Sequence, residues 1–188
     1  MSIVDELERP QVRGLRRAEY DQLARGGAFG DERIVLIRGE LIRMSPQGNE
    51  HSWCIRRLTM LLAPALGDRA DVQVQLPFAA SDDSEPEPDL SVVPRVETIE
   101  DHPSTALLVI EVAASSLRVD LRIKVPLYAA AGVPEVWVVD VKRGVVHVHR
   151  DPAGELYETV FTVPYAGSVT PVCFPDLTLP LASFIYRV

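Results

Sequence analysis

The sequence predicts an α/β or α+β domain in which helices flank a mixed central β-sheet. Two observations carry this prediction. Helix-like patterns alternate with strand-like segments along the chain, which favours helices layered on one sheet. Three strand-like segments, at residues 89–93, 107–113 and 136–140, are mostly apolar and rich in β-branched residues, as is typical of buried strands. We therefore expect these three strands to be neighbours in the interior of the sheet.

The first half of the chain predicts a short helix, a hairpin, a long helix and a strand with one exposed face. Gly39 lies between two short apolar runs and predicts a tight turn. Asn49 is expected to be the N-cap of the long helix, Gly67 to end it, and Pro64 to bend or shorten its last turn. The segments in order are a loose arm over 1–14, a helix over 15–23, a hairpin over 34–42, a helix over 49–66 and a strand over 72–76.

The second half adds a further helix and the remaining strands. The helix is expected over residues 120–131, where Gly132 and Pro134 end it, and Pro126 predicts a late start or a kink. The strands are expected over 89–93, 107–113, 136–140, 145–149, 156–163 and 168–173, with a last short helix near 181–185. No internal repeat or linker is present, so residues 1–188 are expected to form a single domain.

Composition indicates a globular protein of the cytoplasm. Of the 188 residues, 47% are hydrophobic and 24% charged, as in ordinary globular domains. No apolar stretch has the length needed to span a bilayer, and the acidic start of the chain is not typical of a signal peptide. Cys54 and Cys173 form no ligand cluster, and we expect both to be buried, reduced thiols. No membrane partner is expected.

The net charge of −8 limits the possible functions. A passive nucleic-acid binder normally carries a basic face, so this charge weighs against that class. It weighs less against a metal-dependent enzyme, because clustered carboxylates then belong to the site.

Two carboxylates stand beside apolar strand-like runs. Asp89 begins the run 89–93, and Glu111 lies at the end of the apolar run 107–110. A carboxylate on a buried strand is costly unless it is paired or binds a cation. If the strands are adjacent, Asp89 and Glu111 can reach one divalent ion, for which carboxylate oxygens are suitable ligands. The alternative is that each carboxylate caps a strand end in solvent.

A lysine on the following predicted helix could reach these two carboxylates. Asp120 and Lys124 are four residues apart on the predicted helix that follows Glu111. Lys124 could point back to the sheet edge and stabilise charge on a phosphate, with Asp120 orienting it or capping the helix. The alternative is a surface ion pair worth a few tenths of a kcal/mol.

Two further polar residues are weaker candidates. Glu40, in the early hairpin, could add a metal ligand or contact one, and His51, at the start of the long helix, could act as base, ligand or phosphate contact. His147 and His149 lie on a strand expected to face outward, and we assign them no role. Glycine-rich phosphate loops, nucleophile elbows and zinc signatures are absent from the sequence, which argues against those chemistries.

Several segments, taken in order, resemble the Uma-type family of restriction-endonuclease-like proteins, within the PD-(D/E)XK nuclease superfamily. The resemblance covers roughly residues 15–175 and is carried by the ordered series more than by any one piece. The matching residues and segments are 39–46, His51, 87–93, 109–112, Asp120, Lys124, Tyr128 and 131–140. One departure is Val136, where the family usually has an aromatic residue, and it concerns packing rather than chemistry.

The resemblance implies a restriction-endonuclease-like sheet with a magnesium-dependent site. Asp89 matches the first carboxylate of the motif, Glu111 the second, and Glu40 the extra acidic position. The simplest superfamily pattern has its lysine two residues after the second carboxylate, where this chain has Ala113. The family pattern moves the lysine to the following helix, which fits Lys124.

The leading hypothesis is therefore a magnesium-dependent endonuclease that hydrolyses DNA, with manganese able to substitute for magnesium. Asp89, Glu111 and Glu40 are the expected metal ligands, and Lys124 completes the catalytic set. The resemblance also makes a homodimer a reasonable expectation. Two alternatives stay open: a non-catalytic binding or assembly module with the same fold, and a metal-dependent hydrolase of RNA or another phosphodiester.

Overall fold

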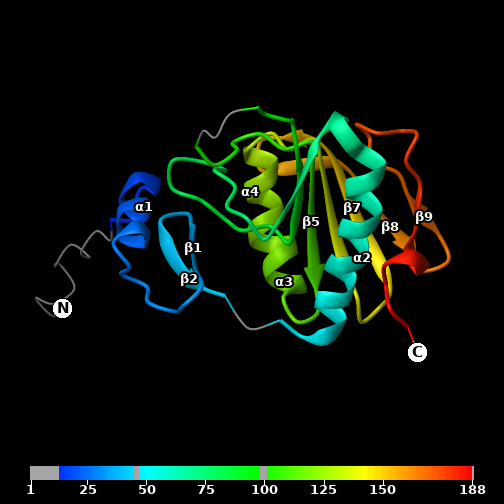
Figure 1. The fold of residues 1–188 in the computed structure, drawn as a ribbon, viewed down its shortest axis with the longest axis horizontal. Helices are drawn as coiled ribbons and strands as arrows, with labels where there is room; N and C mark the ends of the chain where they lie inside the picture. Colours follow the sequence, from blue (N-terminus) through cyan, green and yellow to red (C-terminus); the bar gives the residue numbers. More distant parts are fainter. Residues whose placement is uncertain (1–12, 45–46, 98–100, 188) are drawn as a thin grey trace, which may run out of the picture.

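The central feature of the computed structural model, which describes residues 13–44, 47–97 and 101–187, is a six-stranded mixed sheet (Figure 1). Its strand order is β3-β4-β5-β6-β7-β8. The strands are β3 (Asp71–Val74), β4 (Leu90–Val93), β5 (Leu108–Ala113), β6 (Glu135–Asp140), β7 (Val145–Ala153) and β8 (Leu156–Pro164). The three strands expected to be interior neighbours are β4, β5 and β6, so that prediction is confirmed.

One strand pair of this sheet is parallel. β5 and β6 run parallel, whereas all other neighbouring strands run antiparallel. A parallel pair needs a crossover connection that returns the chain to the starting edge. Residues 117–130 supply it as one helical segment on a face of the sheet. The crossover therefore brings a helix close to the end of β5, where Glu111 lies.

Helices cover both faces of the sheet. The helix α2 (Asn49–Leu66) packs through Cys54, Leu58 and Leu62 on one face, in a cluster with alternate residues of β4 to β7. The crossover helix packs on the opposite face through Val125, Tyr128 and Ala129. Both faces of β5 and β6 are thus covered, which accounts for their continuous apolar character.

The crossover helix has an uneven backbone. It consists of α3 (Leu117–Val119), a π-helical turn η3 (Asp120–Lys124) and α4 (Val125–Ala130). Pro126 has no N–H group to donate to residue 122, and the wider turn absorbs this missing bond. The helix begins at Leu117, earlier than expected, so Asp120 is not its N-cap but lies one turn inside.

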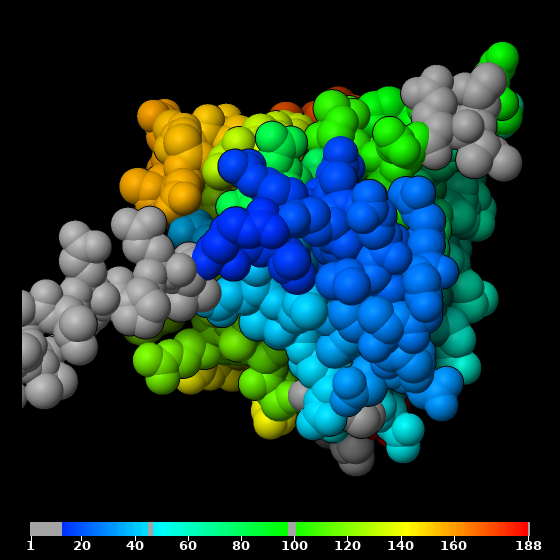
Figure 2. All heavy atoms as spheres, turned by 90° about the vertical axis from the view of Figure 1, so that its left-hand side faces the viewer, coloured from blue at the N-terminus to red at the C-terminus, as the bar shows by residue number. Residues whose placement is uncertain are grey.

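A small hairpin and the helix α1 (Arg17–Arg25) form a separate layer. The hairpin pairs β1 (Ile34–Ile37) with β2 (Glu40–Arg43) and packs through Val35 and Ile37 on Leu127 of α4. Gly39 has a φ of 80°, which glycine adopts without strain, and its backbone touches Gly14. Figure 2 shows α1 and the hairpin as one continuous surface on this side of the molecule.

The C-terminal segment contains less regular secondary structure than expected. It contains a short pair of strands, β9 (Ser168–Val169) with β10 (Leu179–Pro180), and the 3-10 turn η4 (Leu181–Ser183). A 3-10 turn η2 (Gly67–Arg69) follows α2. The predicted strand over 168–173 ends at Val169, since Pro171 cannot donate to a ladder.

Some local expectations are corrected. Gly48, not Asn49, is the N-cap of α2, and Pro64 lies inside this helix without shortening it. The carbonyl of Met60, which Pro64 leaves without its helical partner, is on an exposed residue where water can bind it. Cys54 is buried as expected, but Cys173 is exposed in the loop after β9.

The histidines of β7 and the predicted N-terminal arm need separate comment. His147 and His149 are half-buried on the face covered by the crossover helix, not turned outward, and burial lowers the pKa of His149 to about 4. Most of the predicted arm, residues 1–12, lies outside the described residues. Within the described part of the chain, no helix combines the length and the hydrophobicity required to cross a membrane.

A buried carboxylate ties the C-terminal segment to the sheet. Glu135 is fully buried at the start of β6 and accepts hydrogen bonds from Trp137 Nε1 at 2.7 Å and Arg150 Nε at 2.9 Å. Its other oxygen accepts from the backbone N–H of Val172 at 2.6 Å. Arg150 in turn donates to the carbonyl of Thr170. This network holds residues 170–172 against β6 and β7.

We predict that Glu135→Ala lowers the free energy of unfolding by about 3–5 kcal/mol, because it leaves Arg150 and a buried N–H without partners. Urea denaturation of both proteins measures the change. Glu158→Ala, at an exposed position of β8, is the control and should change stability by less than about 0.5 kcal/mol. Equal stability of the Glu135 variant and wild type would contradict this role.

Candidate active site

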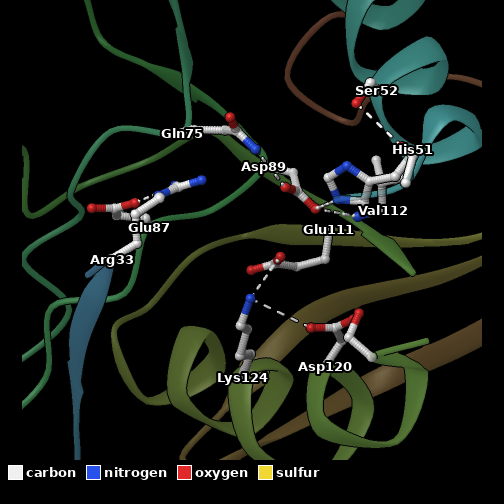
Figure 3. Close-up of polar contacts among 12 residues, drawn as sticks. Arg33, His51, Ser52, Gln75, Glu87, Asp89, Glu111, Val112, Asp120 and Lys124 are labelled. Atoms are coloured by element: carbon white, nitrogen blue, oxygen red, sulfur yellow. Dashed lines mark hydrogen bonds and ion pairs between the residues drawn. The ribbon is translucent and has the colours of Figure 1, made fainter. Parts of the chain in front are cut away.

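Asp89 and Glu111 occupy facing positions at one end of the sheet. The register of β4 and β5 ends with Leu90 opposite Ile110. Asp89 directly precedes β4 and Glu111 directly follows Ile110 in β5, so the two residues are neighbours at this end of the strand pair. Facing residues of an antiparallel pair have Cβ atoms about 5 Å apart. Asp89 is 6% exposed and Glu111 only 1%. The two carboxylates therefore lie side by side and are buried, as Figure 3 shows, and are not solvent-facing strand caps.

Asp89 is held by groups from three elements. Its Oδ2 accepts a hydrogen bond from the backbone N–H of Val112 at 2.8 Å and lies 2.9 Å from Nε2 of His51 on α2. Its Oδ1 accepts only a long bond of 3.3 Å from the Gln75 amide, beyond the end of β3. One oxygen is thus firmly positioned, while the other has spare capacity for a further partner.

Glu111 is held from the opposite face of the sheet. Its Oε2 accepts from Lys124 Nζ at 2.9 Å, and its Oε1 accepts from the Tyr128 hydroxyl at 2.6 Å. Lys124 and Tyr128 are four residues apart on the crossover helix, so their side chains lie on one helical face. Each oxygen of Glu111 makes one such bond and retains a second lone pair.

Lys124 also contacts Asp120. Its Nζ lies 3.4 Å from Asp120 Oδ1, and the other oxygen of Asp120 accepts a 2.6 Å bond from the Ser116 hydroxyl. The Lys124 side chain is 15% exposed and that of Asp120 only 1%. The Asp120–Lys124 pair is therefore buried, and the interpretation as a surface ion pair is wrong. The Ser116 hydroxyl therefore fixes the position of the Asp120 carboxylate.

The cluster places three buried carboxyl groups beside one buried ammonium group. Burial raises the pKa of Glu111 to about 8, although Lys124 opposes the shift. Burial also raises the pKa of Asp120, again against the effect of Lys124. Burial lowers the pKa of Lys124, but Glu111 and Asp120 more than reverse this and hold it above its usual range. With Asp89, three carboxylates share one permanent cation.

A divalent cation of the magnesium type fits this arrangement. Asp89 and Glu111 offer adjacent carboxylate oxygens with free lone pairs, and a cation would offset the excess negative charge. Magnesium keeps several waters and is commonly bound by one or two carboxylates together with substrate phosphates. Among the described residues, no group of three or more histidines, cysteines and carboxylates could hold a metal by itself. The donor set therefore suits a cation that retains waters.

Glu40 is not brought to this cluster. It lies exposed on β2, where it faces Ile37 in the two-stranded hairpin. Among the described residues it has no hydrogen bond or ion pair with Asp89, Glu111 or Lys124. The expectation that Glu40 is a third metal ligand is therefore not supported by the geometry. The physical reason is that β2 belongs to a separate small sheet and not to the ladder that carries the carboxylates.

Sequence reasoning left some members of the cluster without a role. Tyr128 was noted only as part of a resemblance, and its spacing of four from Lys124 is the signal that could have assigned it to Glu111. His51 was left with several roles, and the structure pairs it with Asp89. Gln75 and Ser116 gave no comparable signal, because their contacts depend on the path of the chain beyond β3 and before the helix.

Comparisons with known proteins found a matching family model and a similar solved structure. The model of the family Uma2, described as "Putative restriction endonuclease", matches residues 17–182. A solved structure from Anabaena variabilis ATCC 29413, described as "a putative nuclease belonging to DUF820", superposes with a TM-score of 0.68 at 18% sequence identity. The match covers 91% of this chain and 97% of that chain. No match was found among curated proteins. The structural likeness confirms the predicted restriction-endonuclease-like fold.

We predict a pH-dependent stability difference between wild type and Glu111→Gln. The folded protein keeps the Glu111 proton up to about pH 8, whereas an unfolded chain loses it near 4.5. The folded state thus binds more protons in this window, and wild-type stability falls as pH rises through it. The amide has no proton to lose, so the variant should gain in relative stability from pH 4.5 to 8.

Urea denaturation at several pH values, with a chelator present, measures this difference. Glu158→Gln, at an exposed position of β8, is the control and should show a constant difference from wild type. A Glu111→Gln difference that is equally constant would mean that the folded state does not hold this proton.

Proposed function

This chain belongs to the Uma2 family, and from that premise we propose that it is a magnesium-dependent endonuclease that hydrolyses phosphodiester bonds of DNA. The observation that carries the proposal is the position of Glu111. This buried carboxylate lies beside Asp89 at the end of the β4–β5 pair and accepts hydrogen bonds from Lys124 and Tyr128. Paired carboxylates with an adjacent ammonium group are the elements that metal-assisted phosphodiester cleavage requires.

In the proposed mechanism Asp89 and Glu111 bind the cation. A bound magnesium ion supplies polarisation of the phosphate and lowers the pKa of a coordinated water. Asp89 offers Oδ1 as a ligand because His51 and the Val112 N–H group hold Oδ2. Tyr128 keeps Glu111 in a single rotamer by donating to Oε1. These contacts hold both carboxylates in place before the substrate arrives, and metal binding requires ligands that are fixed in this way.

Lys124 is the proposed charge-stabilising group. Its side chain is mostly buried and its ammonium contacts both Glu111 and Asp120, so its position is well determined. From there it stabilises negative charge on the phosphate in the transition state or orients the attacking water. Asp120 is a positioning residue, since it contacts Lys124 and is itself held by Ser116.

The substrate and the assembly are tested separately from the metal site. DNA is proposed from the family, and RNA is the competing substrate, which parallel cleavage assays on both would distinguish. A non-catalytic module is the second candidate, and the observation that favours it is the absence, among described residues, of a group of three or more His, Cys, Asp or Glu side chains that could hold a metal ion. The homodimer is likewise a proposal, which sedimentation velocity tests directly.

We predict that Asp89→Asn loses magnesium or manganese affinity while it keeps the fold. The amide oxygen can still accept the bond from the Val112 N–H group, and the NH2 group replaces Oδ1, which accepts the long bond from Gln75, but the ligand charge is gone. The affinity should fall by more than the roughly 10- to 100-fold typical of losing an outer-shell partner. Isothermal titration calorimetry measures it, and Asp176→Asn, at an exposed ion pair with Arg69, is the control. Equal affinity of Asp89→Asn and wild type would remove Asp89 from the metal site.

We predict that Lys124→Met reduces DNA cleavage by roughly 10²–10³-fold at saturating metal, as expected for one lost transition-state contact. The substitution also leaves Glu111 and Asp120 without their cation, so it should lower thermal stability as well. Cleavage is therefore compared well below the melting temperature of the variant. Lys142→Met, at an exposed position after β6, is the control. A Lys124→Met protein that stays folded and cleaves as fast as wild type would exclude Lys124 from the chemistry.

A further inference from the structure

A pocket lined by polar and aromatic side chains lies between α2 and the C-terminal segment. It has a volume of about 400 Å³. Its lining consists of Trp53, Arg57, Tyr165, Ala182, Ser183, Ile185, Tyr186 and Arg187. Three of these residues are aromatic, two are arginines and, within the described chain, none is acidic. In a protein with a net charge of −8, a pocket of this composition is unusual and points to an anionic ligand with an aromatic part.

The aromatic groups of this pocket are open to solvent. Trp53 is 37% exposed and Tyr186 is 52% exposed, although large aromatic side chains are normally buried. Their ring centroids are 5.7 Å apart in an edge-to-face arrangement. Because the edge of one ring meets the other, ring surface remains available for a planar ligand to stack on.

The arginines are placed against the aromatic rings. The Arg56 guanidinium lies over the Trp53 ring at 4.9 Å, and that of Arg187 lies over Tyr165 at 5.1 Å. Arg57 donates through Nε to the Ser183 carbonyl at 3.0 Å, and its terminal nitrogens make no hydrogen bond or ion pair to the described residues. Such fixed guanidinium groups suit bidentate binding of phosphate.

The pocket lies at the same end of the sheet as the carboxylate cluster. Figure 1 shows the carboxyl end of β5 and the amino end of α2 at this end, with the C-terminal segment beside α2. Trp53 follows His51 by two residues, so it points about 200° away around the helix, toward the outer side. A nucleic-acid strand whose phosphate reached Asp89 and Glu111 could continue over the first turn of α2 into the pocket.

We infer that this pocket binds an unpaired nucleotide of the nucleic-acid substrate, with its base stacked on Trp53 and Tyr186 and its phosphate held by Arg57 and Arg187. The inference rests on the proposed nuclease function and names its substrate feature. An acidic peptide would use the arginines but leave the exposed rings without a role. A base within a duplex has no free face to offer, so the pocket favours a single-stranded or frayed segment.

Binding of a short, end-labelled oligothymidylate, followed by fluorescence anisotropy with a chelator present, tests the inference without cleavage. Trp53→Ala and Tyr186→Ala should each weaken binding by about 5- to 150-fold, the range for one lost base–aromatic stack. Arg187→Gln should remove about one phosphate contact, so the slope of log K against log[salt] should become less steep by about 1. Met60→Ala, at a 60% exposed position further along α2, is the control and should bind as wild type does.

The intrinsic fluorescence gives an independent readout. The chain has two tryptophans, of which Trp137 is fully buried and hydrogen-bonded to Glu135, so a ligand in the pocket should quench the emission of Trp53 alone. Unchanged oligonucleotide affinity in both aromatic variants would overturn the inference. So would equal binding of duplex and single strand, or equal quenching by oligoglutamate, because the pocket would then recognise charge only.

The test separates this inference from the proposed function. A protein that binds the oligonucleotide through Trp53 but cleaves neither DNA nor RNA with magnesium or manganese supports the pocket and contradicts the nuclease. Cleavage that depends on Asp89, with oligonucleotide binding unaffected by Trp53→Ala and Tyr186→Ala, supports the nuclease and contradicts the pocket.

Discussion

The contact between Lys124 and Glu111 is the interaction on which the arrangement of this protein depends. Glu111 is buried on β5, an interior strand of the sheet, where an unpaired carboxylate would be strongly destabilising. Its partner comes from the crossover that the parallel β5–β6 pair requires, so topology and charge compensation use the same segment. The compensation is incomplete, because Lys124 is shared with Asp120 and Asp89 lies opposite. That imbalance is the physical ground for the cation that we propose at this cluster.

The two faces of the sheet contribute differently to this cluster. From one face α2 supplies His51, which holds Asp89, and from the other the crossover helix supplies Lys124 and Tyr128, which hold Glu111. Each carboxylate therefore depends on a different packing layer. The outer side of α2 also borders the pocket that contains Trp53. A single helix thus connects the interior of the candidate site with the surface over which a substrate strand would lie.

Much of the fold and the core of the site could be predicted from the sequence. The apolar runs identified β4, β5 and β6, and their pairing was enough to bring Asp89 to Glu111. Lys124 followed because helix spacing limits where its side chain can go. Glu40 has no contact with the cluster among the described residues, and nothing in a local pattern states where a separate hairpin docks. The π-turn was missed for a similar reason: Pro126 signals a disturbed helix but not how the backbone absorbs it. Gln75 and Ser116 depend on loop paths, which periodicity does not encode.

The π-turn has a consequence for how this chain can vary in length. Asp120 precedes the widened turn, whereas Lys124 and Tyr128 lie at or beyond its end. Because this turn is already wider than an α-helical one, a further residue inserted between Asp120 and Lys124 would rotate the later part of the helix by about 100° relative to the earlier part. Lys124 and Tyr128 would keep their spacing to each other but lose their alignment with Asp120 and Ser116. Homologous chains should therefore tolerate insertions in the turns between β6, β7 and β8 but not in this segment.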